Sequence, residues 1–164
     1  MDSVKKRGML SALVLLAAVT VFLLFSLTYL LVGMMQGHRI SLSSFSTQNI
    51  TIGKGSYRVF TAVNEGEYTE GLMNVSYQEL QANGSVGMLF VFPGYGNRCF
   101  WMKNTEIPLT QAWITNNSIS YEYNASPYSE NVVCSGAEAV LEVARGSVNA
   151  PSTHAGESVS YSLT

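Results

Sequence analysis

The amino-acid sequence predicts a mainly β fold of the α+β class. We expect a small antiparallel β-barrel or sandwich with one or two short helices, preceded by a single transmembrane helix. About eight short segments have the apolar pattern typical of strands, and residues that favour turns separate them. Residues 9–35 contain no charged side chain. A chain of 164 residues is long enough for one domain with an appended segment.

Residues 9–35 are long enough to cross a membrane as a helix. At about 1.5 Å per residue, such a helix would exceed the roughly 30 Å hydrocarbon core of a bilayer. Lys5, Lys6 and Arg7 precede the apolar run and only Arg39 follows it closely, which favours a cytoplasmic N-terminus. A cleaved signal peptide is the alternative, but its apolar core is usually about half as long.

We therefore expect a single-pass protein of the cell membrane. The expected parts are a cytoplasmic N-terminus, a signal anchor, a short stalk and an extracytoplasmic β domain, at residues 1–8, 9–35, 36–47 and 48–164. The segment after the anchor has six basic residues and ten glutamates, a net charge of −4. This balance argues against a nucleic-acid partner.

Two features agree with an extracytoplasmic domain. Both cysteines, Cys99 and Cys134, follow the apolar run and are expected to form a disulfide, with two free buried thiols as the alternative. Five sequons of the Asn-x-Ser/Thr type also follow it and are candidate glycosylation sites: Asn49, Asn74, Asn83, Asn116 and Asn124.

The first elements of the domain are expected to be a hairpin and two short helices. The hairpin strands and the helices are predicted at residues 48–53, 57–63, 65–73 and 76–81. In the second helix, Ser76 is the expected N-cap and Glu79 completes a capping box.

The remaining strands are predicted at residues 87–92, 98–103, 109–115, 118–124, 138–144 and 157–163. The first of these is apolar on both faces, which predicts a central strand that is covered on both sides. Asn116 and Asn117 separate two strands and tolerate the positive φ of a two-residue hairpin. Residues 93–97 and 125–136 are expected to be loops.

Four blocks in the middle of the chain resemble a known family. They read Gly-Leu-Met at 71–73, Gly-Met-Leu-Phe-Val-Phe at 87–92, Phe-Trp-Met-Lys-Asn-Thr at 100–105 and Ile-Pro-Leu at 107–109. In order and spacing they are similar to the family called domain of unknown function 192. Later segments resemble its closing blocks, so the likeness covers roughly residues 48–163: Val-Leu-Glu-Val at 140–143, Gly146 and Gly156-Glu157.

The resemblance implies a compact, mostly β domain, commonly secreted or anchored, and no established biochemical activity. Family members usually carry an aspartate directly after the Pro-Leu pair, where this chain has Thr110, and a closing Gly-Asp, where it has Gly156-Glu157. If a shared chemistry uses the first carboxylate, this chain lacks it. A binding role would tolerate the change more easily.

The edge that follows the central strand holds the candidate ligand-binding residues: Arg98, Trp101, Lys103, Asn104, Thr105 and Glu106. Charge, amide hydrogen bonds and aromatic stacking suit an anionic or sugar-like ligand. In the structural alternative, Asn104 and Thr105 cap a turn and Lys103 extends past Trp101 into solvent. Arg98 would then form an ion pair with Glu70 or Glu106.

Catalytic and metal sites are weaker hypotheses. A general acid/base pair needs convergent side chains with a shifted pKa, and the candidates are Glu70, Glu106 and Glu142. Thioether and thiolate sulfur atoms are ligands that copper(I) prefers, and the candidates are Met73, Met88 and Met102 with Cys99. However, methionines among phenylalanines usually fill a core. We predict no catalytic residue, no cofactor and no metal.

The function favoured by the sequence is a membrane-anchored extracytoplasmic binding or accessory module. Its partner would be a small polar ligand, a glycan or a neighbouring envelope protein. The alternative is an enzyme of unassigned class with a small polar pocket near Arg98, Lys103 and Glu106. A purely structural spacer is the third possibility.

Overall fold

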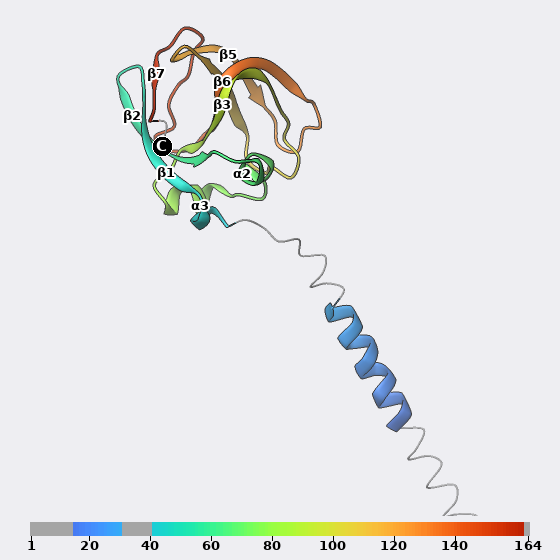
Figure 1. Cartoon of the computed structure of the whole chain (residues 1–164). Coiled ribbons are helices and arrows are strands. Elements are labelled where there is room, and N and C mark those ends of the chain that lie inside the picture. Colours follow the sequence, from blue (N-terminus) through green and yellow to red (C-terminus); the bar gives the residue numbers. More distant parts are fainter. Residues whose placement is uncertain (1–14, 31–40, 163–164) are drawn as a thin grey trace, which may run out of the picture. The chain divides into compact units, whose positions relative to one another are not determined.

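The computed structural model describes residues 15–30 and 41–162, and the chain forms two compact units, Met1–Arg39 and Ile40–Thr164. In the first unit, residues 15–30 form a helix (Figure 1). Its side chains are exposed. Among the described residues, no helix has both the length and the apolar character needed to cross a membrane. The predicted anchor, residues 9–35, extends at both ends beyond the described helix.

The second unit is built on one seven-stranded sheet with the order β5-β4-β6-β3-β2-β1-β7 (Figure 1). Its strands are joined by turns, a short 3-10 helix and two short α-helices. The elements are η1 (Leu42–Ser44), β1 (Ser46–Ile52), β2 (Gly55–Ala62), α2 (Glu65–Glu70), α3 (Tyr77–Ala82), β3 (Gly87–Phe100), β4 (Leu109–Thr115), β5 (Ser118–Ala125), β6 (Val133–Ala144) and β7 (Val159–Ser160).

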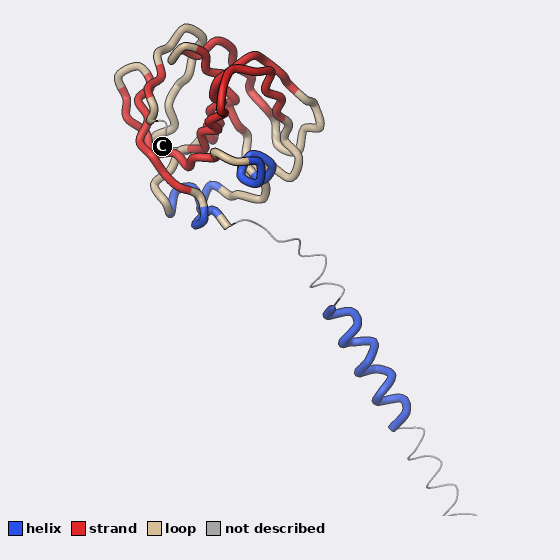
Figure 2. The backbone as a smooth tube through the Cα atoms, in the orientation of Figure 1, coloured by secondary structure: helices blue, strands red, loops and turns tan. Residues whose placement is uncertain are grey.

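The sheet is mixed, whereas the sequence predicted an antiparallel one. β2 and β3 run parallel, and the other neighbouring strands are antiparallel. The reason is the connection between β2 and β3. It forms α2 and α3 before the chain re-enters the sheet, and parallel neighbours require a crossover of this kind. Figure 2 shows the helical segments on one side of the strands.

The sheet curls until its edge strands, β5 and β7, meet at one end. An antiparallel bridge joins Ser118 and Ser158, and the backbone N–H of Ile119 donates to the carbonyl of Glu157 at 2.9 Å. The result is a half-barrel in which both edges of the sheet have partners at this end. The mainly β prediction is therefore confirmed.

Two apolar clusters cover the two faces of the sheet. Met88 and Phe90 belong to one cluster and Leu89 to the other, as alternation along a strand requires. The predicted double coverage of residues 87–92 is thus confirmed. Each fully buried large apolar side chain contributes roughly 1.5–3 kcal/mol, so these faces supply much of the stability.

Three local predictions are confirmed. β1 and β2 form an antiparallel hairpin. The hydroxyl of Ser76 and the carboxylate of Glu79 form the capping box at the start of α3. Asn116 and Asn117, between β4 and β5, have φ values of 50° and 57°, as the two-residue hairpin requires.

Several boundaries differ from the prediction because strand pairing extends further than the apolar pattern. β3 includes residues 93–97, expected to be a loop, and ends at Phe100, so residues 101–103 are not a strand. β6 begins at Val133, opposite Phe100. The domain also starts before residue 48, because Phe45 is only 6% exposed and packs in the first apolar cluster.

Candidate functional site

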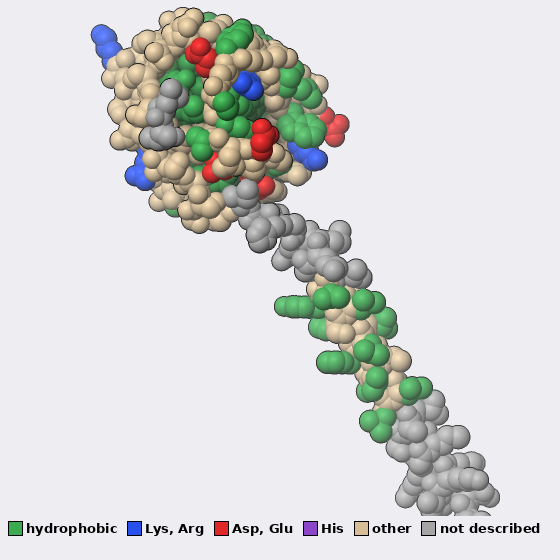
Figure 3. Space-filling view, in the orientation of Figure 1, with side chains coloured by type: hydrophobic (Ala, Val, Ile, Leu, Met, Phe, Trp, Pro, Cys, Tyr) green, Lys and Arg blue, Asp and Glu red, His purple; other side chains and the backbone are tan. Residues whose placement is uncertain are grey.

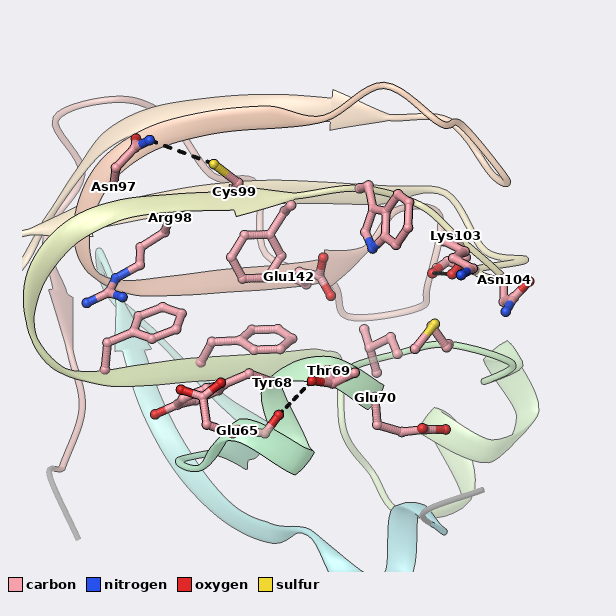
Figure 4. A pocket seen from close by; sticks show the side chains of 18 of the residues that line it. Glu65, Tyr68, Thr69, Glu70, Asn97, Arg98, Cys99, Lys103, Asn104 and Glu142 are labelled. Atoms are coloured by element: carbon pink, nitrogen blue, oxygen red, sulfur yellow. Dashed lines mark hydrogen bonds between the residues drawn. The ribbon is translucent and has the colours of Figure 1, made fainter. Parts of the chain in front are cut away.

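A cavity of about 570 Å³ opens between α2, the second half of β3 and the segment that follows β3; we call it the cleft (Figure 4). Aromatic and charged side chains both line it. On the face of the domain seen in Figure 3, hydrophobic side chains gather next to acidic and basic ones. The aromatic and charged lining residues are Tyr68, Phe90, Phe92, Phe100, Trp101, Glu65, Glu70, Arg98, Lys103 and Glu142.

One wall of the cleft is α2. Its N-cap, Asn64, accepts a hydrogen bond from the first turn, and Gly71 ends the helix with a φ of 49°. Tyr68 on α2 donates a hydrogen bond of 2.6 Å to the carbonyl of Val91. Its ring centroid lies 4.7 Å from that of Phe92. These contacts hold the helix against β3.

The opposite wall carries Arg98. β3 changes register against β6 after Val91, and the indole N–H of Trp113 holds the second half by donating to the carbonyl of Arg98 at 2.8 Å. Cζ of Arg98 lies 4.0 Å from the ring centroid of Phe92. The guanidinium donates to the carbonyl of Gly94 at 2.6 Å, whereas its buried Nε has no hydrogen-bond partner among the described residues.

Arg98 also influences the phenol of Tyr68 across the cleft. Burial and the carboxylate of Glu65 raise the pKa of Tyr68, and the positive charge of Arg98 opposes that rise. Charged groups from α2 and β3 thus lie close enough to interact at this end of the cleft.

The centre of the cleft holds Glu142, a residue of β6 that is 4% exposed. In Figure 4 its carboxyl group points into the cavity between β3 and α2. The side-chain amide of Gln111 donates to Oε1 of Glu142 at 3.0 Å. Burial raises the pKa of Glu142 to about 7, and the hydrogen bond from Gln111 limits the rise. A carboxyl group with this pKa changes its charge near neutral pH.

The other end of the cleft is a turn that follows β3. The backbone N–H of Thr105 donates to the carbonyl of Met102 at 3.1 Å, and Asn104 has a φ of 53°. Nζ of Lys103 lies 5.1 Å from a ring centroid of Trp101, whose side chain is 48% exposed. These contacts are those of a capped turn with Lys103 extended past Trp101, as in the structural alternative to a ligand site. The turn nevertheless borders the cavity.

The structure brings five of the six predicted ligand-binding residues to the cleft: Arg98, Trp101, Lys103, Asn104 and Thr105. The sixth, Glu106, is exposed and is not among the lining residues. Arg98 contacts Phe92 and Gly94 rather than forming the ion pair considered with Glu70 or Glu106.

The disulfide prediction is confirmed, because Cys99 and Cys134 are bonded and lie opposite each other on β3 and β6. Thr110 donates to the side chain of Asn124 at 2.9 Å and does not line the cleft. All five sequon asparagines are exposed, and their glycosylation stays a prediction. In the described part of the chain, no three His, Cys, Asp or Glu side chains could hold a metal ion together.

Sequence reasoning missed the central position of Glu142. In the sequence, Glu142 is a candidate only for one member of a catalytic acid/base pair, although a signal for its burial is present. Glu142 is the single charged residue in the run from Ala137 to Ala144 apart from Glu138 at its start, and a charged residue within a buried strand is rarely buried without a partner. Its partner, Gln111, lies in a different strand, which local spacing does not reveal.

Comparison with known proteins supports the fold. The protein-family model DUF192, described as uncharacterized ACR, matches residues 48–161. The crystal structure of a protein from Sinorhizobium meliloti 1021, provisionally named a transcription regulator, has a similar fold with a TM-score of 0.58. The two sequences are 26% identical, and the match covers 71% of this chain and 95% of that one.

A protein of unknown function from Novosphingobium aromaticivorans DSM 12444 is 22% identical, with a TM-score of 0.57, and the match covers 74% of this chain and 90% of that one. This likeness concerns the fold alone. No curated protein matches the sequence.

Proposed function

The chain belongs to the DUF192 family, and on that premise we propose that it is a membrane-anchored extracytoplasmic binding module that holds a small polar ligand in the cleft. One observation carries the proposal: Arg98 and Lys103 line the same cavity and, in the described part of the chain, contact aromatic rings and a backbone carbonyl rather than carboxylates. Such cations remain available to an anionic group of a ligand.

The lining also supplies apolar area for a ligand. Phe92 and Phe100 line the cavity and are partly buried, while Trp101 is half-exposed at its margin. A concave site with aromatic walls and a few polar groups is the usual form of a small-molecule site. A glycan or a neighbouring envelope protein that inserts a polar side chain would use the same groups.

Two features of the sequence support the location. Residues 9–35 contain no charge and follow three basic residues, as in a signal anchor with a cytoplasmic N-terminus. The disulfide between Cys99 and Cys134 is typical of an oxidising compartment. Protease added to intact cells should therefore remove the domain. Protection of the domain in intact cells, with cleavage only after lysis, would contradict this topology.

The binding role is tested by screening small polar compounds against the full chain by thermal shift. A bound compound should raise the melting temperature, and Arg98→Gln should weaken its affinity by about tenfold or more, as expected for loss of a charged hydrogen bond of about 1.5–3 kcal/mol. Arg58→Gln is the matched control, because Arg58 is exposed and lies outside the cleft. Equal losses in both variants would contradict the placement.

A second variant pair tests the other end of the cleft. Lys103→Met keeps an unbranched, flexible side chain of nearly the same length and removes its charge, whereas Trp101→Ala removes the exposed ring beside it. Both should weaken retention of the same compound. Unchanged retention in both would exclude this end from the site.

An enzyme of unassigned class is the second candidate, favoured by the shifted pKa of Glu142. A general acid or base works best with a pKa near the operating pH, and Glu142 lines the same cavity as Arg98 and Lys103. Turnover of a bound compound that disappears in Glu142→Gln while binding persists would favour this candidate. Recovery of the compound unchanged would favour the binding module.

A further inference from the structure

Glu142 presents one free oxygen to the cleft. The hydrogen bond from Gln111 occupies Oε1, and Oε2 has no donor within the described residues. The side chain is 4% exposed and points into the cavity (Figure 4). An ionised carboxylate oxygen that lacks a donor within the protein can accept one from a ligand, and a hydrogen bond to a charged group is stronger than one between neutral groups.

Within residues 15–30 and 41–162, no charged group forms an ion pair with this carboxylate. The charged and titratable side chains that line the cleft around Glu142 come from β3, from the segment after β3 and from α2; they are Arg98, Lys103, Glu65, Glu70 and Tyr68. None of them shifts the pKa of Glu142, which responds to burial and to Gln111. A cation of a ligand bound in the cleft would therefore be the group that favours the ionised form of Glu142.

The surroundings of Glu142 suit an ammonium group. The rings of Phe90, Phe100 and Trp101 line the same cavity, and aromatic faces attract cations. Glu65 and Glu70 on α2 add negative charge along the wall. An ammonium group would thus meet a carboxylate at the centre of the cleft and aromatic surface around it.

The cleft also offers a place for an anion. Nε of Arg98 is buried without a partner in the described part of the chain, and a guanidinium can bind a carboxylate through two parallel hydrogen bonds. In Figure 4 the side chains of Arg98 and Glu142 lie at different positions along the cleft. One ligand could therefore place opposite charges on both.

We propose, as an extension of the function proposed above, that the ligand is a small zwitterion whose ammonium group binds Glu142 and whose carboxylate binds Arg98. An apolar segment of the ligand joins the two charges along the aromatic wall. A simple carboxylic acid would leave Glu142 without a cation, and a simple amine would leave Arg98 without an anion.

The probes for this proposal are straight-chain ω-amino acids from 4-aminobutanoate to 8-aminooctanoate, titrated into the full chain by isothermal calorimetry. Hexanoate and hexylamine are the single-charge controls for 6-aminohexanoate. Triglycine tests whether a short peptide replaces the aliphatic spacer. One spacer length should bind at least about tenfold more tightly than either single-charge control, because it forms two ionic hydrogen bonds instead of one.

Two substitutions separate the contributions of Glu142 and Arg98 to ligand affinity. Glu142→Gln should reduce affinity for the best ω-amino acid to about that of the simple carboxylate, and Arg98→Gln should reduce it to about that of the amine. Glu130→Gln and Arg58→Gln are matched controls, since both residues are exposed and outside the cleft lining. Circular dichroism of each variant confirms that the fold is retained.

Affinity for the best ω-amino acid should increase with pH. Because burial raises the pKa of Glu142, its carboxylate forms as pH rises through neutrality, while the charges of an aliphatic amine and its carboxylate stay constant. Affinity for the best ω-amino acid should rise about tenfold between about pH 5.5 and about pH 8.5, and Glu142→Gln should abolish the rise. Stronger binding at the lower pH would show that Glu142 acts as a neutral donor and would overturn the proposal.

The two proposals fail in different ways. If no ω-amino acid binds more tightly than its single-charge controls, yet a compound from the thermal-shift screen binds in a manner sensitive to Arg98→Gln, the zwitterion is wrong and the binding module stands. If neither the probes nor the screened compounds respond to substitutions in the cleft, both proposals are wrong.

Discussion

Gln111 on β4 donates a hydrogen bond of 3.0 Å to Oε1 of Glu142 on β6, and the two residues are direct partners in the β4–β6 register. Gln111 is only 1% exposed, so a buried amide orients a buried carboxyl group. The pairing explains how the sheet accommodates an ionisable side chain in a packed layer. The hydrogen bond occupies Oε1 only, so Oε2 of Glu142 stays available on the side of the cleft.

The free energy of unfolding should fall as the pH rises through neutrality. The pKa of Glu142 is about 7 in the folded chain, against an ordinary value of 4.5, so the folded state holds the proton more tightly. The resulting stabilisation is complete below about pH 4.5 and lost above about pH 7, and amounts to about 3 kcal/mol. Urea unfolding between about pH 5 and about pH 8 measures it.

Glu142→Gln is the control for this titration, because glutamine keeps the shape and can still accept from Gln111 but carries no charge. The variant should lose the decline in stability over this range and be more stable than the wild type above pH 7. Parallel pH profiles for the two proteins would show that Glu142 is not the titrating group.

Gly71→Ala should destabilise the domain by about 1–3 kcal/mol. Gly71 has a φ of 49°, and an added Cβ would lie 3.2 Å from Cζ of Phe90, so both backbone strain and crowding of the cleft wall oppose the change. Gly94→Ala is the matched control, since nothing lies within 4 Å of its Cβ. Denaturant unfolding should separate the two variants, and equal stabilities would refute the strain at Gly71.

Removal of the disulfide should lower stability by up to about 4 kcal/mol in the chain-entropy description, because Cys99 and Cys134 are 35 residues apart in sequence. The double variant Cys99→Ala/Cys134→Ala avoids a free thiol. Its unfolding midpoint should match that of the reduced wild type. A midpoint equal to that of the oxidised protein would mean that the crosslink adds no stability.

Ser76→Ala should cost about 1 kcal/mol by removing the N-cap of α3. The hydroxyl oxygen of Ser76 accepts from the backbone N–H of Glu79, and the backbone N–H of Ser76 donates to the carboxylate of Glu79. Ser76→Asp restores a capping oxygen and should recover part of the loss. Thermal unfolding of the three proteins provides the comparison, and an alanine variant as stable as the wild type would contradict the prediction.

Much of the fold could be predicted because its signals are local. The apolar pattern of residues 87–92 predicts burial on both faces, and Asn116-Asn117 predicts a tight hairpin from backbone preference alone. The parallel pairing of β2 with β3 could not be predicted in this way, because no local feature of either strand specifies which neighbour it joins. The extension of β3 through residues 93–97 likewise depends on pairing with β6.

Only the part of the candidate site that is local in sequence could be predicted. Lys103 and Trp101 are two residues apart in sequence, which predicts that their side chains lie together, and Nζ of Lys103 lies over the ring of Trp101. Glu142 reaches the cleft from a strand that lies far from them in sequence, and its pKa depends on burial and on Gln111 from a third strand. Long-range contacts of this kind have no short sequence motif.

The proposed binding site depends on an ionisable carboxyl group, that of Glu142, at the centre of the cleft. Carbon-13 NMR titration of the Glu142 carboxyl carbon in the full chain, with and without the best ω-amino acid, tests this most directly. We expect a midpoint at about pH 7 in the free protein and a lower midpoint with ligand, because a bound ammonium group favours the carboxylate. A midpoint near the ordinary glutamate value of 4.5, unchanged by ligand, would contradict it.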